Sequence, residues 1–214
     1  MNRLINVAMA LALAGLPLLS CSLFSPRPDQ SRFFTLTPIP EADEIVTKGV
    51  SYQAGISVGI GPISIPGYLD RTEIVTRVRA NQLDVSQHDL WAEPLEDNFA
   101  RVLSQNLSAL LHTDRIKLYP WPVVNKPDYQ VQVEVLRFEA SAAGDVQLSA
   151  RWAVRDTGEK NSSEYSESHI SYPARTTSVD GAVATLSEAL GNLSREIAAA
   201  VRSVGDRKEA SVKR

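Results

Sequence analysis

The residues that could do acid–base or metal chemistry are scattered along the sequence. His88, His112 and His169 are the only histidines, and no H-x-x-x-H pair occurs. Metal sites need His, Cys, Asp or Glu clustered at ligand spacing, so we predict no metal site. The string G-x-S-x-G of serine hydrolases and the Walker loop of nucleotide-binding proteins are also absent. We therefore expect no catalytic residues and no enzyme activity.

Two short segments suggest a nucleotide-binding or catalytic site, but each has a simpler structural explanation. Gly59-Ile60-Gly61-Pro62 looks like part of a dinucleotide-binding loop, but the proline removes a backbone donor and β-prone sequence follows where a helix should begin. Glu93, Glu96 and Asp97 stand at the start of a predicted helix, where negative charge stabilises the positive end of the helix dipole. A glycosidase-like carboxylate pair is the weaker alternative at this place.

Cys21 is the residue whose chemistry the sequence predicts most specifically. Arg3 and the apolar run 4–19 have the form of a secretory signal, and the run is short for a permanent membrane span. The run ends in Leu18-Leu19-Ser20-Cys21, which resembles the bacterial lipobox. In a lipobox the cysteine thiol receives a diacylglycerol before the signal is cleaved. We expect the mature chain to begin at Cys21, and an uncleaved N-terminal anchor is the alternative.

Lipidation also accounts for the cysteine content. Cys21 is the only cysteine, so it cannot form an internal disulfide in an exported chain. A diacylglycerol and an N-acyl chain on Cys21 would hold the protein on a bilayer without a transmembrane helix, and we expect no other cofactor. By similarity to lipoprotein sorting signals, Ser22 favours the periplasmic face of the outer membrane over retention in the inner membrane.

The charge of the mature part argues against nucleic acid as a partner. Residues 1–20 contain Arg3 as their only charged residue, so 21 basic and 25 acidic residues remain, a formal charge of −4. A protein that binds nucleic acid usually has a basic excess or a basic stripe. We therefore expect no binding of nucleic acid.

The composition divides the chain into four segments. We predict a signal peptide at 1–20, a lipidated N-terminus and tether at 21–31, one folded domain at 32–205 and a disordered tail at 206–214. The tether carries two prolines and little apolar periodicity. The tail is charged and has Val212 as its only large apolar residue.

Alternating apolar and polar residues predict the strands. The segments 73–78 and 82–86 are predicted to form a hairpin, and 129–138 and 146–154 two long antiparallel strands. Further strands are expected at 33–37, 56–60, 115–119 and 163–172.

Apolar residues at three- and four-residue spacing predict two amphipathic helices. The first begins at Pro94, and the second begins near Ser178 or Asp180 and is expected to end at Gly205. Their apolar stripes are Leu95, Phe99, Val102, Leu103, Leu107, Leu110 and Leu111, then Val183, Leu186, Leu190, Leu193, Ile197, Val201 and Val204. The predicted fold class is α+β: a single domain with a mostly antiparallel sheet of about seven strands and the two long helices packed on one face.

Apolar residues in predicted loops are the candidates for partner binding. Ile63, Ile65, Tyr68 and Leu69 either pack on their own sheet or meet another subunit or a lipid-handling partner. Tryptophans in loops are further candidates because exposed tryptophans are enriched at interfaces. The candidate partner-binding residues are Pro66, Tyr68, Leu69, Asp70, Arg71, Trp91, Glu93 and Trp121.

Five short motifs, in this order, resemble the PqiC/YmbA family of transport-auxiliary lipoproteins. They occupy residues 56–62, 66–71, 74–77, 91–95 and 98–103, behind the lipobox. The chain departs from the family pattern at two places: Thr72-Glu73 stands where the family has Pro-Gln, and Leu90 stands where it has a basic residue. These departures affect which contacts the residues at these two places make, and they do not affect the resemblance to the family.

The resemblance implies a subunit of an MCE-type intermembrane lipid-transport system. Its expected partners are an MCE-domain protein that forms a periplasmic tube, an inner-membrane transporter component, the outer membrane through the lipid anchor, and phospholipid or another lipid. The family also implies self-association into a ring. Two other functions stay open from the residues alone: a lipoprotein regulator of a cell-wall synthase, and a periplasmic hydrolase.

Overall fold

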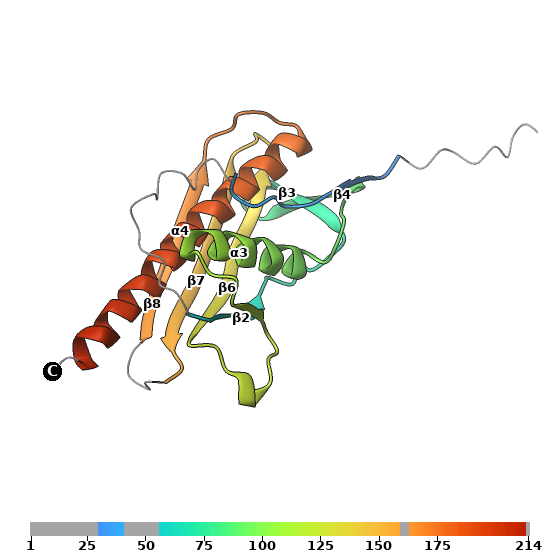
Figure 1. Cartoon of the computed structure of the whole chain (residues 1–214). Coiled ribbons are helices and arrows are strands. Elements are labelled where there is room, and N and C mark those ends of the chain that lie inside the picture. Colours follow the sequence, from blue (N-terminus) through green and yellow to red (C-terminus); the bar gives the residue numbers. More distant parts are fainter. Residues whose placement is uncertain (1–29, 41–55, 159–162, 213–214) are drawn as a thin grey trace, which may run out of the picture. The chain divides into compact units, whose positions relative to one another are not determined.

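Eight strands within the described residues form one sheet, and two α-helices cover one of its faces (Figure 1). The computed structural model describes residues 30–40, 56–158 and 163–212. The chain divides into the units Met1–Gln30 and Ser31–Arg214, and every described strand and helix belongs to the second unit. The predicted signal peptide and the predicted lipidation site Cys21 lie outside the described residues.

The strands follow the alternation that the sequence predicts, and most are longer than expected. They are β1 (Arg32–Phe34), β2 (Val58–Ser64), β3 (Glu73–Arg79), β4 (Gln82–Trp91), β5 (Ile116–Leu118), β6 (Tyr129–Ser141), β7 (Val146–Asp156) and β8 (Ser163–Tyr172). A short 3₁₀ turn, η3 (Val123–Asn125), connects β5 to β6. The predicted hairpin is confirmed, because β3 pairs with β4 in antiparallel fashion.

Strand β6 holds the sheet together, because three of the described strands pair with it. Strand β7 runs antiparallel along nearly its whole length, from Tyr129↔Asp156 to Ala140↔Val146. The other edge of β6 is shared: β2 pairs in parallel with its first half, and β3 pairs in parallel with its last two residues. The segment that connects β2 to β3 therefore leaves the sheet at the point along β6 where pairing with β2 ends and pairing with β3 begins.

The sheet is mixed, so the prediction of a mostly antiparallel sheet is wrong. The pairs β1–β4, β2–β5, β2–β6 and β3–β6 are parallel, and only strands that follow each other in sequence, β3–β4, β6–β7 and β7–β8, are antiparallel. Alternation shows which side chains face the core, but it carries no information on the direction of the partner strand. Parallel pairing needs long connections, and helix α3 lies within the connection between the parallel partners β2 and β5.

Helices α3 (Leu95–Leu111) and α4 (Val179–Val212) lie on the same face of the sheet and bury nearly all of the stripes that the sequence predicts (Figure 1). Phe99 of α3 is fully buried, and its ring meets the ring of Phe138 from β6 edge-on at 5.4 Å between centroids. Leu190 and Leu193 of α4 are also fully buried. Burial of one such side chain contributes about 1.5–3 kcal/mol, so these two stripes supply much of the stability of the domain.

Helix α4 continues beyond its predicted end. It passes through Gly205 and ends at Val212, so the prediction of a stop at Gly205 is wrong, and residues 206–212 are helical where the sequence predicts a disordered tail. Gly205 is buried, and Arg207 pairs with Glu164 of β8 at 2.9 Å between Nη2 and Oε2. Packing and this ion pair outweigh the low intrinsic helix propensity of glycine.

Candidate functional site

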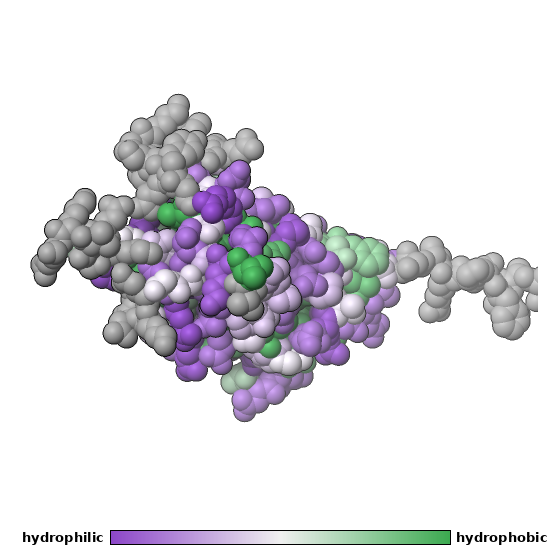
Figure 2. Space-filling view, turned by 60° about the horizontal axis from the view of Figure 1, so that its bottom comes forward, coloured by the Kyte–Doolittle hydropathy of each residue, from purple (hydrophilic) through white to green (hydrophobic). Residues whose placement is uncertain are grey.

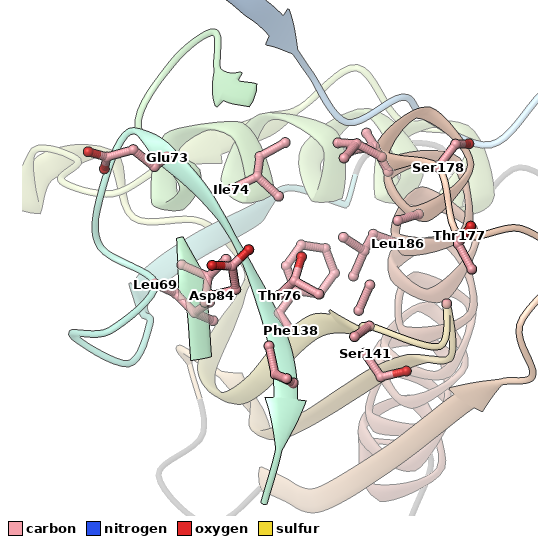
Figure 3. Close-up of a pocket in the computed structure, with 18 of the residues that line it drawn as sticks. Leu69, Glu73, Ile74, Thr76, Asp84, Phe138, Ser141, Thr177, Ser178 and Leu186 are labelled. Carbon is pink, nitrogen blue, oxygen red and sulfur yellow. The ribbon is translucent and has the colours of Figure 1, made fainter. Parts of the chain in front are cut away.

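A cavity of about 190 Å³ lies between the β3–β4 hairpin and the start of α4 (Figure 3). Its walls are mostly apolar, and its rim carries carboxylates and hydroxyls. The main apolar residues of the walls are Leu69, Ile74, Trp91, Leu95, Phe138 and Leu186. Two of the predicted partner-binding residues, Leu69 and Trp91, therefore meet at one place.

One face of the hairpin makes a wall of this cavity. Ile74, Thr76 and Val78 follow each other at every second position of β3, so they point to the same face, and Asp84 of β4 stands opposite Thr76 in the register. Figure 3 shows Thr76 and Asp84 on the hairpin side, and Thr177 and Ser178 across the cavity at the start of α4.

Three of the motifs that carry the family resemblance contribute to the cavity wall. Leu69 comes from the motif 66–71, Ile74 from 74–77, and Trp91 from 91–95. The sequence places these motifs on a loop and two strands, and only the fold brings them together. Sequence reasoning did not assign Phe138 or Leu186 to a site, because each follows an ordinary core pattern of its own element.

Tyr68, the neighbour of Leu69, lies on the opposite face of the sheet in a charged network. Glu139 of β6 is 3% exposed and accepts hydrogen bonds from Arg77, at Nε and at Nη2, and from Arg137 at 2.9 Å. The Arg77 guanidinium lies over the Tyr68 ring, 5.8 Å from its centroid. The network fastens the loop that contains Tyr68 to its own sheet.

The pKa values in this network indicate that the buried ion pair is charged. Burial alone would raise the pKa of Glu139, but hydrogen bonds from Arg77, Tyr68 and Arg137 outweigh it and lower the pKa below the usual value for glutamate. Burial, and then the hydrogen bond with Glu139, raises the pKa of the Tyr68 hydroxyl. A neutral tyrosine therefore faces a charged carboxylate.

The other candidates on this loop have local roles. The carbonyl oxygen of Pro66 accepts the N–H of Leu69 at 2.8 Å, which closes a turn. Arg71 is exposed and pairs with Glu73 at 3.2 Å between Nε and Oε2. Asp70 is exposed as well, and burial, followed by the charges of Asp97 and Asp70, raises the pKa of Glu96 at the start of α3.

Glu93 connects α3 to the N-terminal segment of the domain. Its Oε1 accepts hydrogen bonds from Arg101 at 2.6 and 2.9 Å. The same guanidinium donates to Thr35 at 2.8 Å and to Asn98 at 3.0 Å. The Oδ1 of Asn98 also accepts the backbone N–H of Leu36 at 3.2 Å.

Side chains of both helices then bind the next residues of that segment. The N–H of Thr37 donates to Ser187 of α4 at 3.1 Å, and the N–H of Ile39 donates to Asn106 of α3 at 2.9 Å. These hydrogen bonds from backbone donors to polar helix side chains hold the extended segment in place. Glu93 is thus part of an internal connection in the domain, and not a free charge on the surface.

Trp121 lies apart from these residues, against β2. A side chain at Gly59 would come within 2.8 Å of the Trp121 ring, so the glycine leaves room for the indole. The Tyr119 ring meets Trp121 edge-on at 5.5 Å. Leu118 and Tyr119 are 46% and 57% exposed, and Val124 on η3 is 97% exposed. We call Leu118, Tyr119, Trp121 and Val124 the β5–η3 patch.

The remaining surface is dominated by polar residues. The face in Figure 2 is mainly hydrophilic, and its hydrophobic residues form small separate groups. Among the residues that the structure describes, no group of three or more His, Cys, Asp or Glu could hold a metal ion. In the same part of the chain, no helix is both long enough and apolar enough to cross a membrane.

Comparison with known proteins gives a family match and solved structures with the same fold. A family model described as "ABC-type transport auxiliary lipoprotein component" matches residues 34–198. None of the curated proteins compared with the chain matches it significantly.

Two of the matching structures share the fold at low sequence identity. A crystal structure of an uncharacterised protein superposes with a TM-score of 0.63 at 20% identity and covers 78% of this chain and 96% of its own. A DUF330 protein from Xanthomonas campestris superposes with a TM-score of 0.61 at 16% identity and covers 84% of this chain and 99% of its own.

Proposed function

This chain belongs to the family of ABC-type transport auxiliary lipoprotein components, the PqiC/YmbA family, and from that premise we propose that it docks an MCE-domain tube at the outer membrane. The family match carries the proposal, because it covers residues 34–198 and so nearly the whole folded unit. In the proposed system, the tube protein spans the periplasm and an inner-membrane transporter component lies at its other end. The lipid anchor on Cys21 would keep the protein at the periplasmic face of the outer membrane.

The β5–η3 patch is the surface that we propose for docking. Interfaces are enriched in tyrosine and tryptophan at their centres, and this patch combines both with two exposed aliphatic side chains. The Trp121 ring packs against Gly59 and the Tyr119 ring. A preorganised aromatic surface loses little side-chain entropy when a partner binds.

Crosslinking in envelope membranes tests the docking proposal. We expect the acylated protein to capture an MCE-domain protein, and we expect the double change Tyr119→Ser with Val124→Asp to abolish the capture. Tyr165→Ser is the matched control, because Tyr165 is 66% exposed on β8 and lies outside the patch. Capture of the MCE-domain protein by the double variant at the level of the unchanged protein would refute the assignment of the patch.

The family premise also includes self-association into a ring. We expect the mature chain carrying Cys21→Ser, which lacks the predicted acyl groups, to sediment as a closed oligomer. The measurement is analytical ultracentrifugation over a range of protein concentrations. A single-chain mass at every concentration would exclude the ring.

A further inference from the structure

The cavity between the hairpin and α4 is closed at one end and open at the other. Along the face of β3 that lines it, Ile74 is 6% exposed, Thr76 is half-buried and Val78 is 41% exposed. The closed end lies against the core, where Phe138 and Leu186 contribute to the wall (Figure 3). This shape admits a ligand from the Val78 end only to a limited depth.

The size and walls of the cavity fit a short stretch of hydrocarbon. At roughly 30 Å³ for a group of the size of a water molecule, 190 Å³ holds about six such groups. At the closed end, the side chains of Phe138 and Leu186 offer water no hydrogen-bond partner, so an apolar ligand displaces water from this end readily. A linear alkyl chain would place about six carbons inside and continue outward past Val78.

The rim of the cavity favours a positively charged head group. Asp84 and Glu73 both stand on the rim, and none of the described residues that line the cavity is Lys, Arg or His. Glu73 is paired with Arg71, whereas the Asp84 carboxylate makes no hydrogen bond or ion pair with any residue that the structure describes. An unpaired carboxylate beside the opening attracts an ammonium group and repels a phosphate or sulfate.

We propose that this cavity binds the terminal part of one alkyl chain of an amphiphile whose head group carries an ammonium. The residues with the main roles are Phe138 and Leu186 at the closed end and Asp84 at the opening. The proposal goes beyond docking, because it concerns a ligand of the single folded chain. Docking can fail while the cavity binds, and the reverse also holds.

A chain-length series tests the depth of the cavity. The probes are n-alkyltrimethylammonium ions with four to twelve carbons, below their micelle concentrations, titrated into the mature chain carrying Cys21→Ser and followed by calorimetry. We expect affinity to rise about fourfold with each added methylene, and to level off beyond about six carbons. A rise that continues unbroken to twelve carbons indicates adsorption to the surface and would overturn the proposal.

Filling the cavity tests its location. Ala182 on α4 lines the cavity, so Ala182→Leu should place a larger side chain inside and lower the affinity for the octyl probe at least tenfold. Ala199→Leu is the matched control, because Ala199 is an exposed residue of the same helix. Unfolding by urea shows that both variants are folded. Equal octyl affinity in the two variants would overturn the location.

The head-group preference depends on Asp84 in this proposal. We expect octyltrimethylammonium to bind about fivefold more tightly than octyl sulfate, because one nearby carboxylate in a wet opening has an effect of this size. Asp84→Asn should remove most of the preference, and Asp114→Asn, at an exposed carboxylate outside the cavity, should leave it unchanged. A preference that persists in Asp84→Asn would overturn the role of Asp84.

The protein's own acyl chains are the other possible source of hydrocarbon. The acylated protein and the Cys21→Ser protein distinguish the two sources when the same octyl probe is titrated into both. Equal affinity for the two proteins supports an external amphiphile. A loss of binding confined to the acylated protein means that its own anchor occupies the cavity, and would overturn the proposal of an external ligand.

Discussion

The cavity and the β5–η3 patch contain similar residues in opposite arrangements. In the cavity, Leu69 and Trp91 are almost fully buried and turn toward a space of about 190 Å³. In the patch, Tyr119 and Val124 are mostly exposed. The same residue types are therefore buried in one place and exposed in the other. An aromatic or aliphatic side chain in a predicted loop is by itself no evidence for a surface site. The difference predicts which changes affect stability and which affect binding.

Leu69→Ala should have the largest effect on stability. Leu69 is 3% exposed and borders an existing cavity, so its removal enlarges a space that the chain does not refill. We expect the free energy of unfolding to fall by about 2–5 kcal/mol, measured by urea denaturation. If the free energy of unfolding falls by less than about 1 kcal/mol, Leu69 contributes no more to stability than an exposed residue such as Val124, and the prediction is wrong.

Glu139→Gln should have the next largest effect, on the loop that carries Leu69 and Tyr68. The change leaves the Arg77 guanidinium without its buried partner, and because the Arg77 side chain is 20% exposed, we expect a loss of about 2–3 kcal/mol. Arg71→Gln, which breaks the exposed pair with Glu73, should cost no more than about 1 kcal/mol. Similar losses in the two variants would show that burial of the pair does not matter.

The same carboxylate predicts a dependence on pH. The pKa of Glu139 is lowered in the folded state, so its contribution is fully present above the unfolded value of about 4.3 and is lost as pH falls through the folded pKa. We expect the unchanged protein to lose stability more steeply below about pH 4.3 than Glu139→Gln does. Urea denaturation between about pH 3 and pH 6 measures this, and parallel curves would contradict the charged state of the pair.

Gly59→Ala should have a smaller effect on stability and a clear effect on the patch. The new Cβ would lie 2.5 Å from Cγ of Pro127 and 2.8 Å from Trp121, so the indole must shift. We expect a loss of about 1–3 kcal/mol together with a changed tryptophan fluorescence spectrum. In a chain that also carries Trp121→Phe, the substitution at Gly59 should leave the spectrum nearly unchanged.

Val124→Ser should have the smallest effect. Val124 is 97% exposed, so we expect the free energy of unfolding to change by less than about 0.5 kcal/mol. The same variant should weaken capture of the docking partner. A marked loss of stability would mean that the side chain packs within the fold, as Leu69 does.

The sequence predicts local structure well here, because each helix has an apolar stripe and most strands have alternating apolar and polar residues. The stripes of α3 and α4 and the β3–β4 hairpin are confirmed. Strand direction is not predictable in the same way, since the parallel pair β2–β6 joins segments about 70 residues apart and alternation is the same in both directions. The end of α4 was missed because buried packing at Gly205 and the Arg207–Glu164 pair are tertiary effects.

The candidate site was predictable only in part for the same reason. Leu69 and Trp91 stand out as apolar residues in or beside predicted loops, and the structure brings them together. Phe138 and Leu186 complete the cavity from β6 and α4, but in the sequence they are ordinary core residues. Glu93 was a candidate for partner binding, but Arg101 of α3, eight residues further along the chain, binds it and also donates to Thr35, which is 66 residues from Arg101 in sequence. Lipidation at Cys21 stays a prediction.

The N-terminal segment has a mechanical consequence for a chain held at that end. Tension along β1 would meet its parallel pairing with β4 over Arg32–Phe34, and then the bonds from Leu36, Thr37 and Ile39 to side chains of α3 and α4. Because the ladder bonds lie across the strand, such a pull shears several of them together and does not peel them apart one at a time. A pulling force on the first residues of the domain is thus shared between the pairing of edge strand β1 with β4 and the hydrogen bonds to both helices.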